Sequence, residues 1–306
     1  MTTWIIDDTG FEKQGEHSVG VQRQYTGSAG KITNCQIGVS LSVANDHGHL
    51  PIDFELYLPE SWTMDPARRK EVKIPEEIKF QTKIELALQM IERAANDNIP
   101  GEIVLADGDY GKAPQFRETI RLHGLDYGLG VHSSTSIWRV DPRDRRVGAP
   151  LTVSELGRRL MHGGYRRARW REGTKAWLSS RFCLRRVVIN QEDGSEPNER
   201  EQVWLLIEWP EGEKVPTKFF LTTLPRRMAI KQIVRVLKER WRTEQAYQEM
   251  KGDLGLDHFE GRSFPGWHHH VSVVLCCYAF VVAERARRFP PSALWSRPDH
   301  PLRRAA

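Results

Sequence analysis

The residues of this chain best suited to chemistry are acidic side chains that end or interrupt apolar segments. Asp7 and Asp8 close the apolar stretch "TTWIIDD", Asp107 closes "GEIVLAD", and Glu244 lies within a helical pattern. Magnesium prefers hard oxygen ligands and binds through a few carboxylates together with substrate phosphates. Two such ions about 4 Å apart can stabilise the attacking and leaving oxygens of phosphoryl transfer. These acids could form such a site, although acids in these places more commonly form turns or cap helices.

The stretch "LKERWRTEQAYQEMKGDLGLDHF", residues 237–259, predicts a helix with three charged residues on one side. At about 100° per residue, Arg240, Glu244 and Lys251 fall on one narrow stripe. An ordinary interpretation is an Arg240–Glu244 ion pair on a solvated face, which would stabilise the helix by about 0.3 kcal/mol. That interpretation leaves Lys251 unexplained, so a metal and phosphate site stays open as the alternative.

Apolar patterning predicts the elements that must hold these residues. The first 132 residues indicate the order β-β-β-α-β-α-β, and strands joined by helices behind an antiparallel meander predict a mixed α/β sheet. The expected strands are 2–10, 32–46, 50–59, 101–107 and 127–132, and the expected helices are 75–97 and 113–124.

Charge is segregated along the chain. The formal net charge is +5, yet residues 143–186 carry thirteen Lys and Arg against three Asp and Glu, so the rest of the chain is net negative. Three predicted strands, 182–190, 201–209 and 217–225, follow or overlap this basic window. A basic, mostly β insertion is therefore expected before the last helices.

The basic window predicts a DNA surface better than a solvated face. Arginines bind phosphates and aromatic rings stack on exposed bases, and "YRRARWR" (165–171) combines the two. The predicted DNA-binding residues of this segment are Arg166, Arg167, Arg169 and Arg171.

Composition indicates a globular protein. The chain has 306 residues with 39% hydrophobic and 28% charged residues, which excludes a disordered protein. No signal peptide is expected, and the apolar run 271–283 is too short to cross a bilayer, so it predicts a buried helix. Its adjacent Cys276 and Cys277 are expected to be buried thiols, consistent with a reducing cytoplasm.

Several motifs together resemble a known family. The pattern formed by Arg240, Glu244 and Lys251 resembles the Tyr-Arg-Glu-Lys signature of DDE transposases from bacterial insertion sequences. "DDTG" and "LADGDYG" resemble the sites of that family's first and second aspartates, and "HSVGVQRQYTGSAGK" and "FEGRSFPGWHHHV" resemble its SRSO17-like branch. The resemblance covers nearly the whole chain, in the order aspartate, aspartate, basic β insertion, glutamate.

The resemblance implies a ribonuclease H-like α/β fold, with a mixed sheet flanked by helices and interrupted by the basic insertion. The implied parts are 1–132 for the first part of the core, 133–226 for the insertion, 227–288 for the helices with the third carboxylate, and 289–306 for a flexible tail.

The resemblance also implies the site. Asp7, Asp107 and Glu244 would be the catalytic carboxylates and would bind two Mg²⁺ ions, with Mn²⁺ as a possible substitute. Asp8 stays an alternative first ligand, because neighbouring strand residues point to opposite faces and only one of the two can bind. Arg240 and Lys251 would hold DNA phosphates near the cut.

The implied activity is cut-and-paste DNA transposition, a form of DNA recombination that joins an endonuclease step to strand transfer. Its partners would be double-stranded DNA, at transposon ends and target, and a second copy of the chain in a homodimer on DNA. The expected location is the bacterial cytoplasm, at the nucleoid, with no membrane association.

The chain departs from the family pattern in two places. Leu237 stands where the family has its signature tyrosine, and the chain begins almost on the first catalytic strand, without the usual N-terminal domain. Two alternatives therefore stay open: a catalytically impaired transposase remnant that only binds DNA, and another ribonuclease H-like nuclease, such as a junction resolvase.

Overall fold

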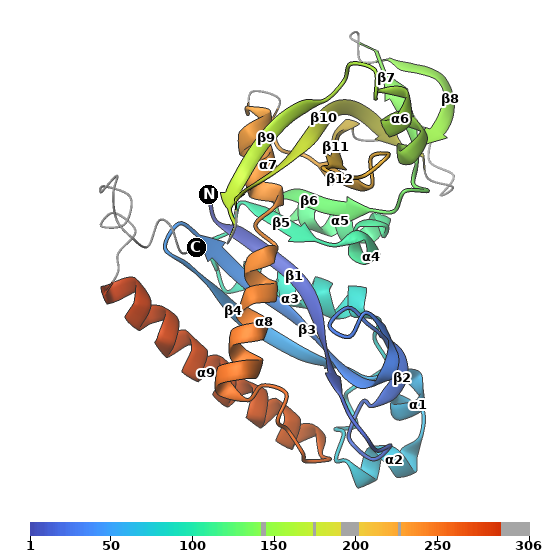
Figure 1. Cartoon of the computed structure of the whole chain (residues 1–306). Coiled ribbons are helices and arrows are strands. Elements are labelled where there is room, and N and C mark those ends of the chain that lie inside the picture. Colours follow the sequence, from blue (N-terminus) through green and yellow to red (C-terminus); the bar gives the residue numbers. More distant parts are fainter. Residues whose placement is uncertain (142–144, 174–175, 191–201, 226–227, 289–306) are drawn as a thin grey trace. The chain divides into compact units, whose positions relative to one another are not determined.

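The structure is a computed structural model that describes residues 1–306 except 142–144, 174–175, 191–201, 226–227 and 289–306 (Figure 1). The described chain forms two compact units. Unit one comprises Met1–Glu102 and the chain from Arg240 through the last described helix, and unit two comprises Ile103–Glu239. This division does not test the predicted core, insertion and tail, which stay a prediction; the predicted tail lies outside the described residues.

Unit one is built on an antiparallel sheet whose central strand is β3. This strand pairs with β1 from Thr3↔Ala44 to Glu12↔Cys35, and it also pairs with β2 and β4. The strands are β1 (Thr3–Glu12), β2 (Gln22–Thr26), β3 (Lys31–Asn45) and β4 (Gly48–Tyr57). The helices are α1 (Glu60–Thr63), α2 (Pro66–Glu71), α3 (Lys83–Asn96), α8 (Trp241–Leu254) and α9 (Phe264–Arg288).

Unit two combines a parallel strand pair with an antiparallel sheet. Strands β5 and β6 are parallel, and β6 continues through β12, β11, β10 and β7 to β8, with β9 paired to β10. The strands are β5 (Ile103–Ala106), β6 (Asp126–Val131), β7 (Ser136–Val140), β8 (Arg146–Thr152), β9 (Arg166–Glu172), β10 (Trp177–Ile189), β11 (Gln202–Pro210) and β12 (Lys218–Thr222). The helices are α4 (Gly108–Gly111), α5 (Pro114–Leu122), α6 (Val153–Arg159) and α7 (Ile230–Leu237).

The chain is therefore a mixed α/β protein with sheets flanked by helices, as predicted. The expected strands correspond to β1, β3, β4, β5, β6, β10, β11 and β12. The described part of 133–226 is mostly β, although β7, β8, β9 and α6 had not been identified individually. Strand β2 was also missed, because its polar sequence "QRQYT" lies in a segment expected to be a loop.

Two predicted helices have different limits in the structure. The helix expected at 75–97 begins only at Lys83, because Thr82 and Glu85 form a reciprocal capping box that fixes the start there. The helix expected over 237–259 is shorter, since α7 ends at Leu237 and α8 runs only over Trp241–Leu254. In the break, Lys238 binds Glu208 and lies over the ring of Trp170 in unit two.

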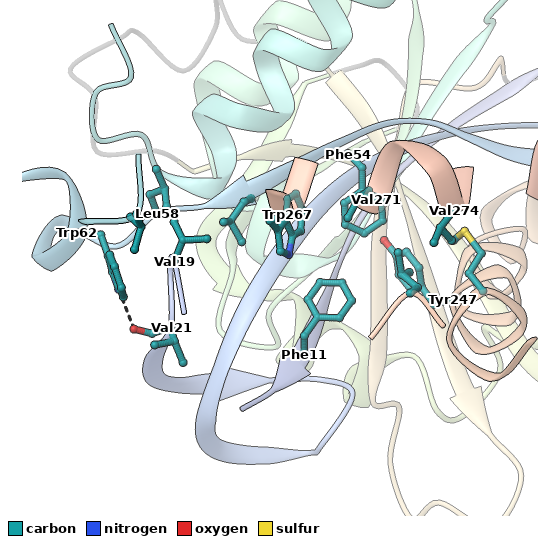
Figure 2. Close-up of a cluster of buried hydrophobic side chains, with 14 of the residues drawn as sticks. Phe11, Val19, Val21, Phe54, Leu58, Trp62, Tyr247, Trp267, Val271 and Val274 are labelled. Carbon is teal, nitrogen blue, oxygen red and sulfur yellow. Dashed lines mark hydrogen bonds between the residues drawn. The ribbon is translucent and has the colours of Figure 1, made fainter. Parts of the chain in front are cut away.

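An aromatic cluster forms the core between the sheet of unit one and helices α8 and α9 (Figure 2). The Trp267 ring lies 6.2 Å from Phe11 and 6.1 Å from Phe54, and Tyr247 lies 6.1 Å from Phe54, measured between ring centroids. Gly38 leaves room for the Phe54 ring, because a Cβ at this position would stand 2.1 Å from that ring. The cluster thus holds both helices on this face of the sheet.

Helix α9 buries one face only, which corrects the prediction of a buried helix. Its buried residues are Trp267, Val271, Val274 and Tyr278, whereas Phe280 is 67% exposed. Cys276 and Cys277 are exposed, so the prediction that both thiols are buried was wrong. By length and composition, α9 is long and apolar enough to cross a membrane. Core helices of globular proteins often meet the same two criteria.

Buried polar pairs fix α8 on the β3–β4 hairpin. Tyr247 and Ser40 share a hydrogen bond of 2.6 Å between their hydroxyls, and Thr243 Oγ1 lies 2.9 Å from His49 Nε2. Arg242 donates to the carbonyl oxygen of Asn45 at 2.8 Å. Because a buried polar group costs free energy unless it is paired, these bonds specify one position of α8 along the sheet.

The Tyr247–Ser40 bond predicts a non-additive mutant cycle. Tyr247→Phe or Ser40→Ala alone leaves a buried hydroxyl without its partner and should lower the free energy of unfolding by about 1–3 kcal/mol. The double variant should lose less than the sum, because neither hydroxyl remains. Urea unfolding of the four proteins measures this, with the exposed Tyr25→Phe as a neutral control. Additive losses would show that the two hydroxyls do not depend on each other.

Burial lowers the pKa of His49 to about 3, and the nearby Arg242 charge acts in the same direction. In the unfolded chain His49 binds a proton below about pH 6.5, whereas in the folded chain it stays neutral there. The free energy of unfolding therefore falls as the pH drops below about 6.5. His49 should account for about 2 kcal/mol of the stability lost between pH 7 and pH 5. His49→Gln should flatten the unfolding free energy in this window, whereas the exposed neighbour His47→Gln should leave the slope unchanged. Equal slopes in the wild type and His49→Gln would contradict the assignment.

Candidate active site

Asp7 lies on the face of β1 that α8 covers. It stands opposite Ser40 in the β1–β3 register, and Ser40 bonds to Tyr247 of α8. Asp7 is 7% exposed, and its Oδ1 accepts a hydrogen bond of 3.1 Å from Arg240 Nη2. A buried carboxylate on a strand thus faces the helix that also carries Glu244.

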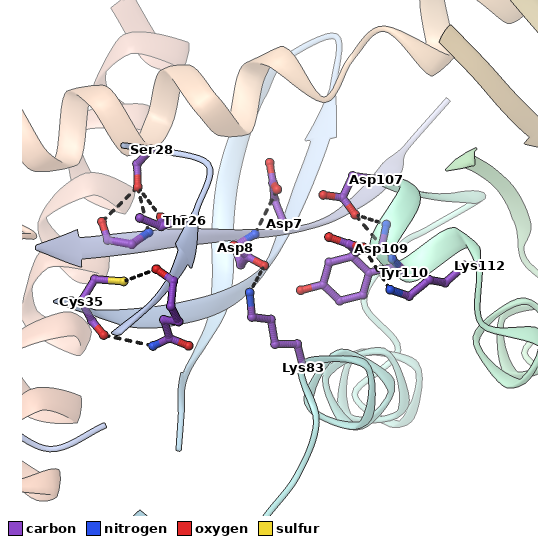
Figure 3. A network of polar contacts seen from close by, with 12 residues as sticks. Asp7, Asp8, Thr26, Ser28, Cys35, Lys83, Asp107, Asp109, Tyr110 and Lys112 are labelled. Carbon is purple, nitrogen blue, oxygen red and sulfur yellow. Dashed lines mark hydrogen bonds and ion pairs between the residues drawn. The ribbon is translucent and has the colours of Figure 1, made fainter. Parts of the chain in front are cut away.

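Asp8 points to the other face of the same strand (Figure 3). Its Oδ2 accepts a hydrogen bond of 3.0 Å from Lys83, at the start of α3. This follows from strand geometry, which sends successive side chains to opposite faces. Asp7 therefore lies on the face of β1 that α8 covers, and Asp8 lies on the opposite face, next to α3.

The charged stripe of α8 runs along one border of its buried face. Arg240 reaches Asp7, and Lys251 Nζ donates a hydrogen bond of 2.7 Å to the carbonyl oxygen of Gly10. Both ends of the stripe therefore contact β1. Glu244 lies between them on the same stripe, so α8 presents this glutamate alongside the strand that carries Asp7.

The ordinary Arg240–Glu244 ion pair is not the contact that forms. Arg240 pairs with Asp7 instead, and the Glu244 side chain is exposed. Among the residues that the structure describes, no hydrogen bond or ion pair is made by the Glu244 carboxylate. An exposed carboxylate at the border of a buried acid is available to an added cation.

Burial shifts the pKa values of two residues near Asp7 and Glu244, namely Lys251 and Tyr247. Burial lowers the pKa of Lys251, whose ammonium also lies 5.0 Å from the centre of the Phe11 ring. Burial raises the pKa of Tyr247 well above its usual range, and the negative charge of Asp7 acts in the same direction. Tyr247 is therefore a neutral hydrogen-bonding group beside Asp7.

In unit two, Asp107 follows β5 directly and caps α4 (Figure 3). Its Oδ1 accepts from the backbone N–H of Asp109 at 2.9 Å, the role that an ordinary capping acid would have. Asp109 binds Lys112 at 3.1 Å and lies 3.5 Å from His132. Burial alone would raise the pKa of Asp109, but Lys112 and His132 lower it overall, so this second acid is held ionised.

The donor chemistry of the predicted site suits a hard divalent cation, because Asp7, Asp107 and Glu244 all offer carboxylate oxygens. Within the described part of either unit, no three His, Cys, Asp or Glu side chains are grouped as a metal site requires. The predicted set takes two acids from unit one and one from unit two, and its convergence stays a prediction.

The predicted DNA-binding arginines lie on β9 of unit two. Arg166, Arg167 and Arg169 are exposed, whereas Arg171 is half-buried. Arg167 forms an ion pair with Glu211, which compensates part of its charge. The four arginines therefore differ in how much positive charge they offer to a phosphate.

The aromatic residues among these arginines mostly serve packing. The Trp170 ring lies 5.7 Å from Phe182, and the Tyr165 ring lies 5.4 Å from Trp209. Only Trp177, of the three aromatic residues interleaved with basic ones in 165–177, is strongly exposed, at 48%. Phosphate binding by arginine is thus better supported here than base stacking.

Sequence reasoning missed the buried polar partners of α8. Ser40, His49, Thr243 and Tyr247 come from segments that are distant in sequence, and each would pass as an ordinary core or strand residue. Lys83, which binds Asp8, was also missed. A basic residue at the start of an amphipathic helix gives no signal of a strand partner.

Comparisons with known proteins relate this chain to endonucleases and to a transposase. A sequence model of the family described as "DDE superfamily endonuclease" matches residues 1–182, more than half of the chain. Over 131 residues, 42% of this chain and 32% of the relative, the chain is 29% identical to the "Probable transposase for insertion sequence element IS701" of Microchaete diplosiphon. That match spans less than half of the relative's length.

A solved structure, the NurA nuclease from Sulfolobus solfataricus, aligns over 94% of this chain and 84% of its own at 10% identity, with a TM-score of 0.30. A TM-score this low supports no conclusion about fold or function. The family match carries the identification, because it covers more than half of the chain. The chain belongs to the DDE superfamily endonucleases.

Proposed function

We propose that this chain is a transposase that cleaves DNA strands at insertion-sequence ends and joins them to a target. The observation that carries the proposal is the arrangement of unit one, where a buried Asp7 faces the helix that carries Arg240, Glu244 and Lys251. The IS701 transposase relative supports the same activity. Membership in the Tyr-Arg-Glu-Lys group, its SRSO17-like branch and a ribonuclease H-like fold are further parts of this proposal.

The proposed catalytic residues are Asp7, Asp107 and Glu244. Divalent ions, Mg²⁺ or Mn²⁺, would supply charge neutralisation and activation of water when bound. Asp7 and Glu244 would offer carboxylate oxygens from unit one, and Asp107 would offer the carboxylate oxygen that does not cap α4. Asp8 is the weaker choice of first ligand, because Lys83 binds it on the opposite face of β1.

The basic residues would position DNA. Arg240 stands beside Asp7 and would hold a phosphate next to the carboxylates, and Lys251 would do so further along α8. The exposed arginines of β9 would bind the duplex backbone away from the cut. After strand cleavage, the freed 3′ hydroxyl would be held for attack on the target, so catalysis rests on positioning and charge neutralisation. A homodimer on DNA at the bacterial nucleoid completes the proposal.

A matched pair of variants tests the first carboxylate. Asp7→Asn should reduce Mg²⁺-dependent nicking of a duplex that carries the insertion-sequence end by several orders of magnitude, because it removes a charged ligand. Asp8→Asn neutralises the adjacent residue on the other face and should keep most of the activity. Nicking on a labelled duplex measures both, with circular dichroism to check folding. Equal activity of Asp7→Asn and wild type would exclude Asp7 as a metal ligand, and absence of nicking by the wild type itself would leave only the DNA-binding remnant. Inactivity of a folded Asp8→Asn would move the first ligand to Asp8.

The arginines of β9 predict a salt dependence. Each lost phosphate contact should flatten the slope of log binding constant against log salt by about 0.9. Replacing Arg166, Arg167, Arg169 and Arg171 by alanine should remove fewer than four contacts, because Glu211 already binds Arg167 and Arg171 is half-buried. Fluorescence anisotropy on duplex DNA at several salt concentrations measures the slope.

The control for this experiment is Arg287→Ala with Arg288→Ala at the end of α9. Both arginines are exposed and pair with Glu284, so they test the effect of removing surface charge elsewhere. Their slope should match that of the wild type. An unchanged slope in the β9 variant would exclude this strand from the DNA surface.

A further inference from the structure

Arg240 stands at the start of α8, a position where an arginine does not stabilise the helix. It is the N-cap residue of α8, with φ −53° and ψ −30°, and its side chain makes no capping hydrogen bond. Arginine caps poorly, and a positive charge at a helix N-terminus opposes the helix dipole. The stability of α8 therefore gives no reason for an arginine here, and its contact with β1 must be considered instead.

That contact is a charge pair with a buried acid. Arg240 Nη2 lies 3.1 Å from Asp7 Oδ1, and the side chains are 22% and 10% exposed. A carboxylate at this depth costs free energy unless a cation or hydrogen-bond donors compensate it. In this structure the guanidinium supplies positive charge at the carboxylate proposed to bind a divalent ion.

We propose that Arg240 is the resident cation of Asp7 in the metal-free protein, and that it moves to a DNA phosphate when a divalent ion binds Asp7. This inference rests on the proposed function, since it needs Asp7 to be a metal ligand. It adds that metal binding and phosphate binding are coupled through one side chain. Without DNA, the ion must displace Arg240; with DNA, the phosphate takes Arg240 and leaves Asp7 open.

The surroundings of Arg240 allow such an exchange. It stands in the short junction between α7 and α8, where no regular helix fixes its backbone on the N-terminal side. Two neighbouring cations of α8 each donate to a backbone carbonyl oxygen, Arg242 to Asn45 and Lys251 to Gly10. Arg240 instead binds a carboxylate, a partner for which a divalent ion competes.

The exchange has a thermodynamic consequence. If DNA raises metal affinity by removing Arg240 from Asp7, then metal must raise DNA affinity by the same factor. Each ligand would bind poorly alone and better with the other. The chain would thus bind the divalent ion at Asp7 mainly when DNA is also bound.

Metal affinity without DNA is the first test. Titration calorimetry with Mn²⁺ should show weak binding to the wild type and, in Arg240→Gln, tighter binding by about threefold to tenfold, as expected for removing one partly exposed competing pair. Arg242→Gln removes a charge from the same end of α8, at a side chain that donates to the carbonyl oxygen of Asn45, and should match the wild type. Equal or weaker Mn²⁺ binding by Arg240→Gln would overturn the proposal.

Metal affinity with DNA is the second test. A duplex carrying the insertion-sequence end should tighten Ca²⁺ binding by the wild type and not by Arg240→Gln, with Ca²⁺ used because it does not demand the octahedral geometry of Mg²⁺. In the wild type, Ca²⁺ should also steepen the salt slope of DNA binding by about 0.9, the value of one added phosphate contact. Coupling that persists in Arg240→Gln would assign it to another residue.

Two further results separate this inference from the proposed function. If Asp7→Asn leaves Mn²⁺ affinity unchanged, Asp7 is not a ligand and the proposed function fails first. If Asp7→Asn abolishes binding while Arg240→Gln does not tighten it, only the exchange fails. Should Arg240→Gln unfold in metal-free buffer, refolding by added Mg²⁺ supports the exchange and failure to refold overturns it.

Discussion

A buried carboxylate must have a compensating charge, and in unit one this constraint falls on Asp7. The strand that carries it is covered by α8, so its partner must come from that helix. Arg240 meets the need at the N-cap, a place where an arginine weakens the helix rather than stabilising it. The cost to the helix is small beside the cost of an uncompensated buried carboxylate. The pairing therefore explains why an arginine stands at the start of α8.

The position of α8 depends in turn on neutral polar contacts. Tyr247 with Ser40 and Thr243 with His49 lie on the buried side of the helix, and the aromatic cluster around Trp267 holds the same face (Figure 2). Apolar packing alone tolerates sliding, whereas a buried hydroxyl must find its partner at one register. Glu244 has no described partner of its own, so these bonds decide where its carboxylate stands. The position of the Glu244 carboxylate is therefore set by the neutral side chains of Tyr247 and Thr243.

The parts of this molecule that follow local rules could be predicted from sequence. Strands with apolar alternation, such as β1 and β3, and the strand of Asp107 have the expected places, and the opposite directions of Asp7 and Asp8 follow from strand geometry. Features set by distant contacts could not be predicted. The pairing of Arg240 with Asp7 instead of Glu244 joins residues 233 positions apart, and nothing within α8 distinguishes the two acids. The contact of Lys238 with Glu208 of β11, in the break after Leu237, likewise joins residues that are distant in sequence.

The break itself shows how one short segment serves both units. Lys238 binds Glu208, which is 2% exposed in unit two, and Arg240 binds Asp7, which is 7% exposed in unit one. Two cations, two residues apart, thus each compensate a buried acid within their own unit. Burial lowers the pKa of Lys238, and the Glu208 charge opposes this, because the ion pair favours the charged ammonium. Within unit one, the start of the Glu244 helix is thereby tied to charge neutralisation of Asp7 on β1, because the residue that caps this helix is also the cation of the buried carboxylate.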